Sequence, residues 1–236
     1  MKRIWPVFLA LALAISLAAC NSERTASSNA PAPSPSSAAD QTGGSESSPA
    51  EGTGSGILIA YFTMPEDVDT SGVDAIAGAS IVVRGGQVMG NVEYMAAIIQ
   101  ETVGGDLFRI ETVQPYPLDH DPLVDQAAEE QDEDVRPALA THIENLDRYD
   151  TVLLGYPNWW GDMPQALYTF LGEYDFSGKT IIPFCPHGGS GFSRTESTIA
   201  ALQPGATVSE NGLTISRNDV ADSAEEIAAW VESLGL

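Results

Sequence analysis

The sequence predicts an α/β fold in which helices cover both faces of a parallel β-sheet. Residues 57–62, with the sequence ILIAYF, form a near-continuous apolar run. Such a run is typical of a parallel strand that is buried on both faces. Strand-like and helical segments then alternate five times up to the C-terminus. This alternation favours right-handed crossovers and therefore a doubly wound sheet.

Short apolar and β-branched runs predict five strands. They span 57–62, 107–113, 151–155 and 180–185, with a weaker fifth divided between 206–208 and 213–215. In addition, 81–83 and 87–89 flank Arg84-Gly85-Gly86, which predicts a small β-hairpin.

Apolar residues spaced three or four apart predict helices between these strands. The predicted helices span 92–103, 123–146 with a break at Pro137, 164–171 and 220–234. Asp219 is the expected N-cap of the last helix, and Trp230 is expected to belong to the core.

The first twenty residues have the pattern of an export signal. Lys2 and Arg3 precede sixteen uncharged residues, Ile4 to Ala19, and this run is shorter than the roughly 20 residues that a membrane-spanning helix needs. The run ends in L-A-A-C, which resembles a bacterial lipobox and predicts lipidation of Cys20. An ordinary signal peptide with a chance cysteine is the alternative. With a lipid anchor, the protein would be exported and held at a membrane, facing the exterior or periplasm.

Residues 21–55 are expected to be a disordered tether. Ser, Thr, Pro, Gly and Ala supply 27 of these 35 residues, so the segment has little apolar bulk to bury. The remaining 181 residues, 56–236, are long enough for one well-buried domain.

The charge excludes one class of partner. The chain carries 33 acidic and 10 basic residues, a formal net charge of −23, which argues against binding nucleic acid. Nearly all of this charge belongs to residues 56–236, at −22. We expect the domain to repel anionic lipid beneath its anchor and to attract a basic redox partner.

Two strand ends are followed by loops with the composition of a ligand site. Residues 155–164, GYPNWWGDMP, place aromatic rings and prolines together; they suit a flat aromatic ligand, or else form a plug folded back on the domain. Residues 186–193, PHGGSGFS, let the main chain approach a ligand closely. His187 in this loop is expected to bond either a ligand or the backbone.

The sequence gives little support for a nucleophilic serine or for a metal site. Ser190 lies outside a G-x-S-x-G nucleophile motif, because Phe192 occupies the last position, and no catalytic residue is predicted. The carboxylates of Asp119, Asp121 and the run 125–134 lack the spacing of a metal site, so no metal is predicted and a solvated helix face is expected.

At these loops the sequence resembles the flavodoxin-like family. The resemblance runs over essentially all of 56–236 and is carried by ILIAYFT, GNVEYMAAIIQ, GYPNWWG and PFCPHGGSGF. It implies a three-layer sandwich with a five-stranded sheet of order 2-1-3-4-5 that binds FMN. The resemblance assigns FMN to two sets of residues. The phosphate set is Thr63, Gly90, Asn91 and Val92. The ring set is Tyr156, Pro157, Asn158, Trp159, Trp160, Gly161, His187, Gly188, Gly189, Ser190 and Gly191.

The sequence departs from the family pattern at three places. An insertion of 27 residues, 64–90, divides the phosphate loop. Val92 stands where a threonine hydroxyl would bind phosphate, and Glu93 beside a phosphate would not help. Pro186 stands where this branch often has threonine.

The function expected from this resemblance is electron transfer by a tethered FMN protein. The rival is an FMN-dependent reductase that passes electrons from NAD(P)H to a quinone or another small acceptor; a lid formed by 64–90 would favour it. An apo binding or scaffolding module that has lost the cofactor is a third possibility.

Overall fold

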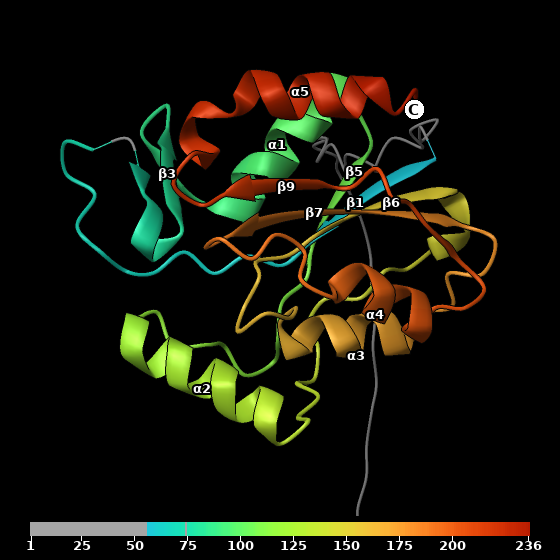
Figure 1. Ribbon diagram of the computed structural model, residues 1–236, viewed down its shortest axis with the longest axis horizontal. Helices are drawn as coiled ribbons and strands as arrows, with labels where there is room; N and C mark the ends of the chain where they lie inside the picture. The colour runs from blue at the N-terminus through green and yellow to red at the C-terminus, as the bar shows by residue number, and fades with distance from the viewer. Residues whose placement is uncertain (1–55, 74) are drawn as a thin grey trace, which may run out of the picture. The chain divides into compact units, whose positions relative to one another are not determined.

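Six parallel strands form the central sheet of the computed structural model (Figure 1). They are β1 (Ile57–Tyr61), β5 (Asp106–Arg109), β6 (Thr151–Gly155), β7 (Thr180–His187), β8 (Thr207–Val208) and β9 (Leu213–Ser216). Their order is β5-β1-β6-β7-β8, and β9 also pairs with β7. If β8 and β9 are taken as one interrupted strand, this is the expected 2-1-3-4-5 order.

The structure describes residues 56–73 and 75–236. The predicted signal peptide (1–20), the lipidation site Cys20 and the tether (21–55) lie outside these residues. Within them, no helix is both long enough and apolar enough to cross a membrane.

The last strand is interrupted beside Pro183. Ile181 pairs with Val208 and Phe184 with Leu213, so four residues of one strand, 209–212, lie opposite two residues of β7. Because Pro183 has no N–H group, it cannot donate a hydrogen bond to a neighbouring strand. The extra residues leave the sheet here, which accounts for the weak and divided pattern of the fifth predicted strand.

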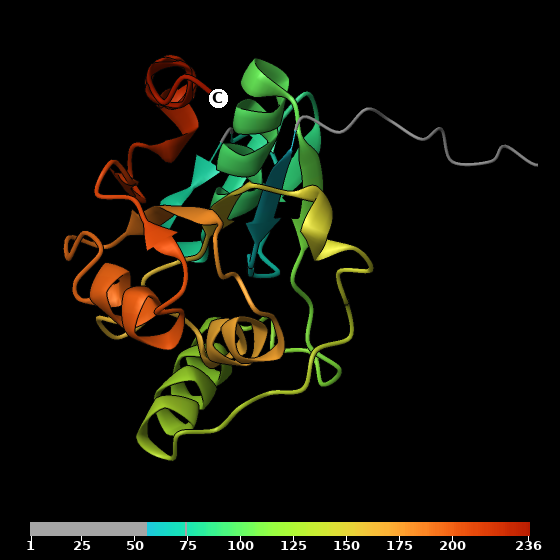
Figure 2. The same cartoon turned by 90° about the vertical axis from the view of Figure 1, so that its right-hand side faces the viewer.

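Helices cover both faces of the sheet, as the two views show (Figures 1 and 2). Helices α1 (Asn91–Val103) and α5 (Ala224–Ser233) lie on one face, and α3 (Gln165–Glu173) and α4 (Thr195–Leu202) lie on the other. Helix α2 (His120–Asp132) packs beside α3. The fold is therefore the predicted three-layer α/β sandwich.

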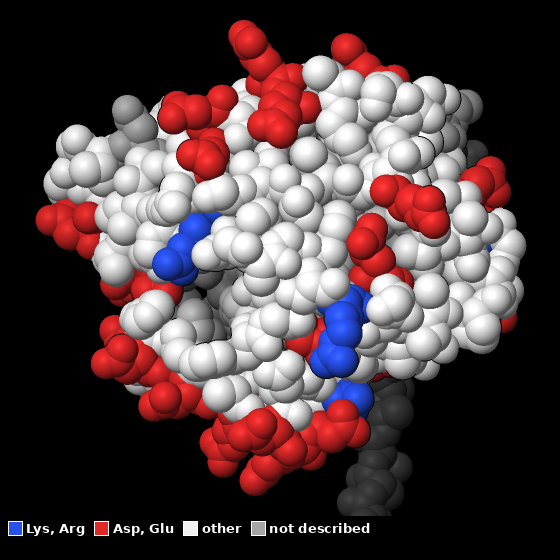
Figure 3. All heavy atoms as spheres, in the orientation of Figure 1, with Lys and Arg blue, Asp and Glu red and all other residues white. Residues whose placement is uncertain are grey.

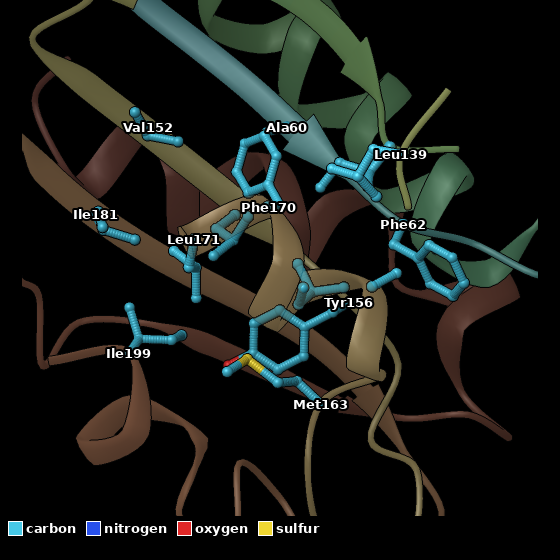
Figure 4. Close-up of a cluster of buried hydrophobic side chains, with 14 of the residues drawn as sticks. Ala60, Phe62, Leu139, Val152, Tyr156, Met163, Phe170, Leu171, Ile181 and Ile199 are labelled. Carbon is cyan, nitrogen blue, oxygen red and sulfur yellow. The ribbon is translucent and has the colours of Figure 1, made fainter. Parts of the chain in front are cut away.

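Strand β1 shows why the apolar run had to be continuous. Ile57, Ile59 and Tyr61 belong to the core beneath α1 and α5, whereas Leu58 and Ala60 belong to the opposite core. Since successive side chains of a strand point to opposite faces, a strand covered on both faces needs apolar residues throughout. Figure 4 shows part of the second core, where Ala60, Phe170 and Ile181 come together from β1, α3 and β7.

The insertion 64–90 folds into a small antiparallel sheet of its own. It contains β2 (Ala75–Ile76), the 3-10 helix η1 (Ala77–Ala79), β3 (Ile81–Arg84) and β4 (Gln87–Gly90). The predicted hairpin is confirmed, since β3 and β4 pair with Arg84 opposite Gln87. Gly85 and Gly86 make the turn with φ angles of 59° and 82°, which glycine adopts without strain.

Two predicted helices have different bounds in the structure. Helix α2 ends at Asp132, whereas helix was expected up to residue 146. Asp134 has a left-handed φ of 55°, and the chain then returns antiparallel to residues 109–113, where Val113 N–H donates to Ala138 O and Ala140 N–H to Glu111 O. The C-terminal helix starts at Ala224, so the prediction of Asp219 as its N-cap was wrong.

The remaining short elements lie near these corrections. The 3-10 helices η2 (Leu146–Arg148) and η3 (Val220–Asp222) precede β6 and α5 respectively. Asp219 precedes η3 without a side-chain capping bond. Trp230 in α5 packs against the core next to Phe184, as expected, and its indole N–H donates to Asn211 O at 2.8 Å.

Candidate functional site

A cavity of about 220 Å³, here called the main cavity, lies at the carboxyl ends of β1, β6 and β7. Figure 3, in the orientation of Figure 1, shows a hollow left of centre, between these strand ends and α2. This is where an open parallel sheet usually binds its ligand. The wall is formed by Thr63, Met64, Glu66, Gly78, Ser80, Asn91, Val92, His120, Leu123, Val124, Ala127, Pro157, Asn158, Trp159, Trp160, Pro186, His187, Gly188 and Arg217.

The predicted phosphate residues meet although the insertion separates them in sequence. A Cβ atom on Gly90 would lie 2.0 Å from Thr63 Oγ1 and 3.3 Å from Pro65 Cδ. Only glycine therefore allows β4 to approach the end of β1 this closely. Thr63, Asn91 and Val92 all reach the wall of the main cavity, and Gly90 supports them from behind.

Asn91 is a buried amide whose side chain has no partner. The residue belongs to the wall of the main cavity and is only 2% exposed, and neither Oδ1 nor Nδ2 forms a hydrogen bond with another described residue. Buried polar groups are nearly always bonded, and one left unpaired costs about 1–3 kcal/mol. The hydrogen bonds of this amide are therefore unmet within the described residues, at a position in the cavity wall.

The first turn of α1 already uses some of its N–H groups. Asn91 N–H donates to Ser80 O at 2.9 Å, and Gly90 N–H donates to the Glu93 carboxylate at 3.4 Å. Val92 contributes a methyl surface to the wall and no donor. The insertion, which supplies Ser80, and the replacement of a threonine by Val92 therefore both weaken the N-terminus of α1 as an anion site.

The insertion forms one wall of the main cavity. Met64, Glu66, Gly78 and Ser80 line it, and Ser80 adopts a left-handed φ of 56°. Glu66 Oε1 lies 2.8 Å from His120 Nδ1 at the start of α2. The hydrogen bond and the charge of Glu66 raise the pKa of His120. This contact joins the insertion to the opposite side of the cavity.

The aromatic loop ends in a tight turn that presents Trp160. Trp159 N–H donates to Asp162 O at 2.8 Å, and Asp162 N–H donates to Trp159 O at 2.9 Å. Trp160 and Gly161 between them have φ angles of 52° and 79°, as in a type I′ turn. A left-handed conformation is uncommon for a bulky side chain, and such strain is concentrated at functional sites.

The two tryptophans of this loop have different surroundings. Trp159 packs edge-on against Phe62 and Tyr116, with ring centroids 5.6 Å apart in both pairs. Trp160 is 61% exposed, and its indole N–H donates to Val124 O at 3.3 Å. Trp159 is therefore partly buried and packed against the core beside the cavity, whereas the ring of Trp160 is the more exposed of the two.

Tyr156, which the resemblance places in the ring set, does not line the main cavity. Its ring is completely buried in the core shown in Figure 4, and its hydroxyl donates to Thr195 Oγ1 at 2.8 Å. Burial raises the pKa of this hydroxyl well above its usual value. The buried ring of Tyr156 therefore anchors the start of the aromatic loop in the core.

The glycine-rich loop contributes fewer residues than expected. His187 and Gly188 line the main cavity, but Gly161, Gly189, Ser190 and Gly191 lie outside its wall. Gly189 N–H donates to His187 Nδ1 at 2.9 Å, so a neutral His187 carries its proton on Nε2 and can donate it to a ligand. His187 thus bonds the backbone and faces the cavity as well.

Asn158 ties the two loops together. Its Nδ2 donates to Gly191 O at 2.9 Å, and its Oδ1 accepts from Gly161 N–H at 3.1 Å. Pro157 and the main chain of Asn158 lie at the wall, where Asn158 N–H donates to Pro186 O. The loops after β6 and β7 are therefore held as one unit.

Several wall residues were not predicted from the sequence. They are Met64, Glu66, Gly78, Ser80, His120, Leu123, Val124, Ala127, Pro186 and Arg217. A signal existed for Arg217, which directly follows β9 at the carboxyl end of the sheet. No such signal existed for the α2 residues, because their position depends on the long connection between β5 and α2.

The arrangement suits a flat, largely apolar ligand with a polar or anionic end. Trp159, Trp160, Leu123, Val124 and Ala127 supply apolar surface to the wall. Donors come from Thr63, Asn91, His187 and Arg217. Cys185 has no place in this chemistry, because it is buried in the core, and burial raises the pKa of its thiol.

Comparison with known proteins identifies the family. A family model described as flavodoxin matches residues 81–234. A candidate flavoprotein from Bacteroides eggerthii DSM 20697 is 26% identical, with a TM-score of 0.56, and the match covers 76% of this chain and 98% of that one. A candidate flavoprotein from Bacteroides uniformis ATCC 8492 is 28% identical, with a TM-score of 0.50 and coverages of 72% and 97%.

A third solved structure is a flavoprotein in complex with FMN from Lactobacillus acidophilus NCFM. It is 18% identical, with a TM-score of 0.47 and coverages of 70% and 96%. No curated protein matches the chain. The family model spans well over half of the sequence, and the sheet order agrees with it. This chain belongs to the flavodoxin family.

Proposed function

We propose that this chain binds FMN in the main cavity and transfers electrons as a membrane-tethered redox protein. The observation that carries the proposal is the amide of Asn91, a residue of the cavity wall whose two buried polar atoms have no hydrogen-bond partner among the described residues. Membership of the flavodoxin family and the apolar wall around Trp159 and Trp160 support the same ligand. When bound, FMN would supply the redox chemistry.

The residues of the cavity fit FMN in kind. Asn91, Thr63 and His187 would bind its polar groups, and Trp160 would stack on its ring. Leu123 and Val124 of α2 would exclude water from that ring. The cavity, at about 220 Å³, is smaller than the roughly 300–1,000 Å³ of most small-molecule sites. Part of FMN would therefore remain in solvent, or the contact between Glu66 and His120 would open.

The experiment compares the wild type with Asn91→Leu. An apolar side chain of similar size relieves the unpaired amide, so we expect the free variant to be more stable by about 1–3 kcal/mol. The same change should weaken FMN binding at least tenfold. Urea unfolding of the apoprotein and titration with FMN measure the two effects. A variant that loses stability and keeps its FMN affinity would contradict the proposal.

The acidic surface suggests the kind of partner. Acidic side chains greatly outnumber basic ones on the face shown in Figure 3, and residues 56–236 carry a formal charge of −22. A basic redox protein would be attracted to such a domain over long distances. The tether of 21–55 and an anchor on Cys20 would keep the domain at the membrane that the partner visits.

A reductase is the second candidate, because the insertion forms a wall of the cavity. Glu66 and Ser80 cover a side that a pure carrier would leave open to protein partners. Stopped-flow mixing of the FMN-loaded protein with NADH and with NADPH separates the two functions. Rapid reduction by either nucleotide, followed by transfer to a quinone, would establish the reductase.

A further inference from the structure

The arginines of the domain differ in whether they are paired. Four of them lie within 4.0 Å of a carboxylate: Arg84 with Glu101, Arg109 with Glu111, Arg136 with Asp134, and Arg148 with Asp106. Among the described residues, neither Arg217 nor Arg194 has such a partner. In a domain of charge −22, an arginine without a carboxylate partner is a positive charge left available.

Arg217 directs this charge toward the main cavity. It is the only arginine or lysine in the wall formed by the described residues. Its backbone N–H donates to His187 O at 2.8 Å, which fixes the residue at the end of β7. Its guanidinium Cζ lies 3.9 Å from the position that a Cβ on Gly188 would take, so the side chain passes over this glycine.

The chain after Arg217 is held against the first turns of α1. The 3-10 helix η3 packs on α1, and Tyr94 Oη donates to Ala221 O at 3.3 Å. Arg217 itself contacts the loop after β7, and the segment that follows it packs on α1, the helix that begins at Asn91. Both residues line the same cavity, one with a charge and the other with an unpaired amide.

The N-terminus of α1 has fewer free hydrogen-bond donors for a phosphate than an uncapped helix N-terminus would have. Val92 has no donor in its side chain, and two N–H groups are bonded to Ser80 O and the Glu93 carboxylate. Glu93 and Glu66 also place negative charge near the cavity. A phosphate in this cavity needs a compensating cation, and the planar guanidinium binds phosphate oxygens in pairs.

We propose that Arg217 is the residue that binds the phosphate group of FMN in this protein. The proposal rests on FMN as the ligand of the main cavity. Arg217, together with the amide of Asn91, would bind the phosphate in place of the hydroxyl that Val92 lacks.

The test compares FMN with riboflavin, which has the same ring and no phosphate. Both are titrated into the wild type, Arg217→Gln, Arg217→Lys and Arg194→Gln, and binding is followed by flavin fluorescence. Arg194 is the matched control, because it is also unpaired but lines a separate cavity on the other side of Trp160. Thermal unfolding checks that each variant folds.

We expect Arg217→Gln to weaken FMN about 10- to 100-fold and to leave riboflavin unchanged. Arg217→Lys keeps the positive charge but loses the two parallel N–H donors of the guanidinium, so we expect an intermediate loss of FMN affinity and unchanged riboflavin affinity. If Arg217→Gln does not fold, the result with Arg217→Lys tests the proposal. Arg194→Gln should bind both flavins as the wild type does. The wild type should also lose FMN affinity with rising salt more steeply than Arg217→Gln.

Equal losses for FMN and riboflavin in Arg217→Gln would overturn the proposal, because they would place Arg217 at the ring. Unchanged binding of both would overturn it as well. In either case FMN binding by the wild type would leave the proposed function intact. If the wild type bound neither flavin, the proposed function would fail and the role of Arg217 with it.

Discussion

His120 Nδ1 lies 2.8 Å from Glu66 Oε1, so one hydrogen-bonded pair connects the 64–90 insertion to α2 beside the main cavity. A second link runs in parallel, since Asp67 N–H donates to Leu118 O at 3.0 Å. The cavity wall is therefore closed by segments that are more than fifty residues apart in the sequence.

The first prediction concerns the titration of His120. Glu66 raises its pKa through a hydrogen bond and charge, Asp121 adds to this, and Arg217 opposes it. Glu66→Gln should lower the pKa of His120 toward the ordinary value of 6.5. Histidine signals in NMR spectra recorded over pH 5 to about 9 measure the change.

The sign of the pH dependence follows from the raised pKa. The stabilisation by this pair is fully present below 6.5, the ordinary pKa of histidine, and is lost as pH rises through the higher pKa of the folded protein. Glu66→Gln should remove that dependence. If the variant and the wild type have the same His120 pKa, the contact does not exist in solution.

The second prediction uses the close approach of Gly90 to Thr63. Gly90→Ala would place a Cβ 2.0 Å from Thr63 Oγ1, so β4 or Thr63 must move. We expect a loss of about 1–3 kcal/mol in the free energy of unfolding and a marked loss of FMN affinity. Denaturant unfolding and FMN titration measure the two quantities.

Gly172→Ala is the control for this substitution. A Cβ there meets no atom within 4 Å, and the residue lies inside helix α3, where alanine is favoured by about 0.5–1 kcal/mol. The control should therefore be at least as stable as the wild type and should bind FMN normally. A Gly90→Ala protein that behaves like this control would refute the predicted clash.

The third prediction separates the two tryptophans. Trp159→Ala removes a ring packed against Phe62 and Tyr116, so we expect a loss of about 3 kcal/mol in stability. Trp160→Ala removes a ring that is 61% exposed and held at a left-handed φ, so little stability should be lost. The loss of stacking should instead weaken FMN binding about 2- to 10-fold. If Trp159→Ala instead lost FMN affinity and Trp160→Ala lost stability, the flavin ring would lie against Trp159.

The fourth prediction concerns Tyr156, whose ring lies in the core outside the cavity wall. Tyr156→Phe removes its hydrogen bond to Thr195 Oγ1, at a cost of about 0.5–1.5 kcal/mol in stability. Because the side chain lies outside the cavity wall, FMN affinity should not change. A specific loss of FMN affinity without a loss of stability would restore Tyr156 to the binding site.

The fifth prediction concerns the acidic surface. With the FMN-loaded and reduced protein, electron transfer to a basic cytochrome c should slow as ionic strength rises, because salt screens the attraction. Transfer to ferricyanide, an anion, should become faster under the same conditions. Stopped-flow absorbance follows both acceptors. If the rate with the cytochrome does not depend on ionic strength, the acidic surface does not steer a basic partner.

The fold was predictable from the sequence because its signals are local. The apolar run of β1, the helical spacing in α1 and the turn glycines after β3 are each decided by near neighbours. The end of α2 was not predictable in this way. Residues 138–141 leave the helical pattern to bond with 109–113, and such a pairing across thirty residues is invisible to periodicity.

The position of the site at the strand ends was predictable from the sequence, whereas the set of side chains that line it was less so. The loops after β6 and β7 were found, but the ring of Tyr156 lies outside the cavity wall. Strand alternation gives the reason, because Val152, Leu154 and Tyr156 all point into the same core. His120 reaches the cavity only through the tertiary fold, so residue spacing did not reveal it, whereas Arg217 could have been found from its position directly after β9.

The central claim is that the main cavity binds FMN, and equilibrium titration of the flavin-free protein with FMN tests it most directly. Trp159 and Trp160 in the wall make tryptophan fluorescence the natural signal. We predict saturable quenching at one FMN per chain, together with a bound-flavin absorption spectrum. A protein that stays colourless after titration, with unchanged tryptophan fluorescence, would contradict the account.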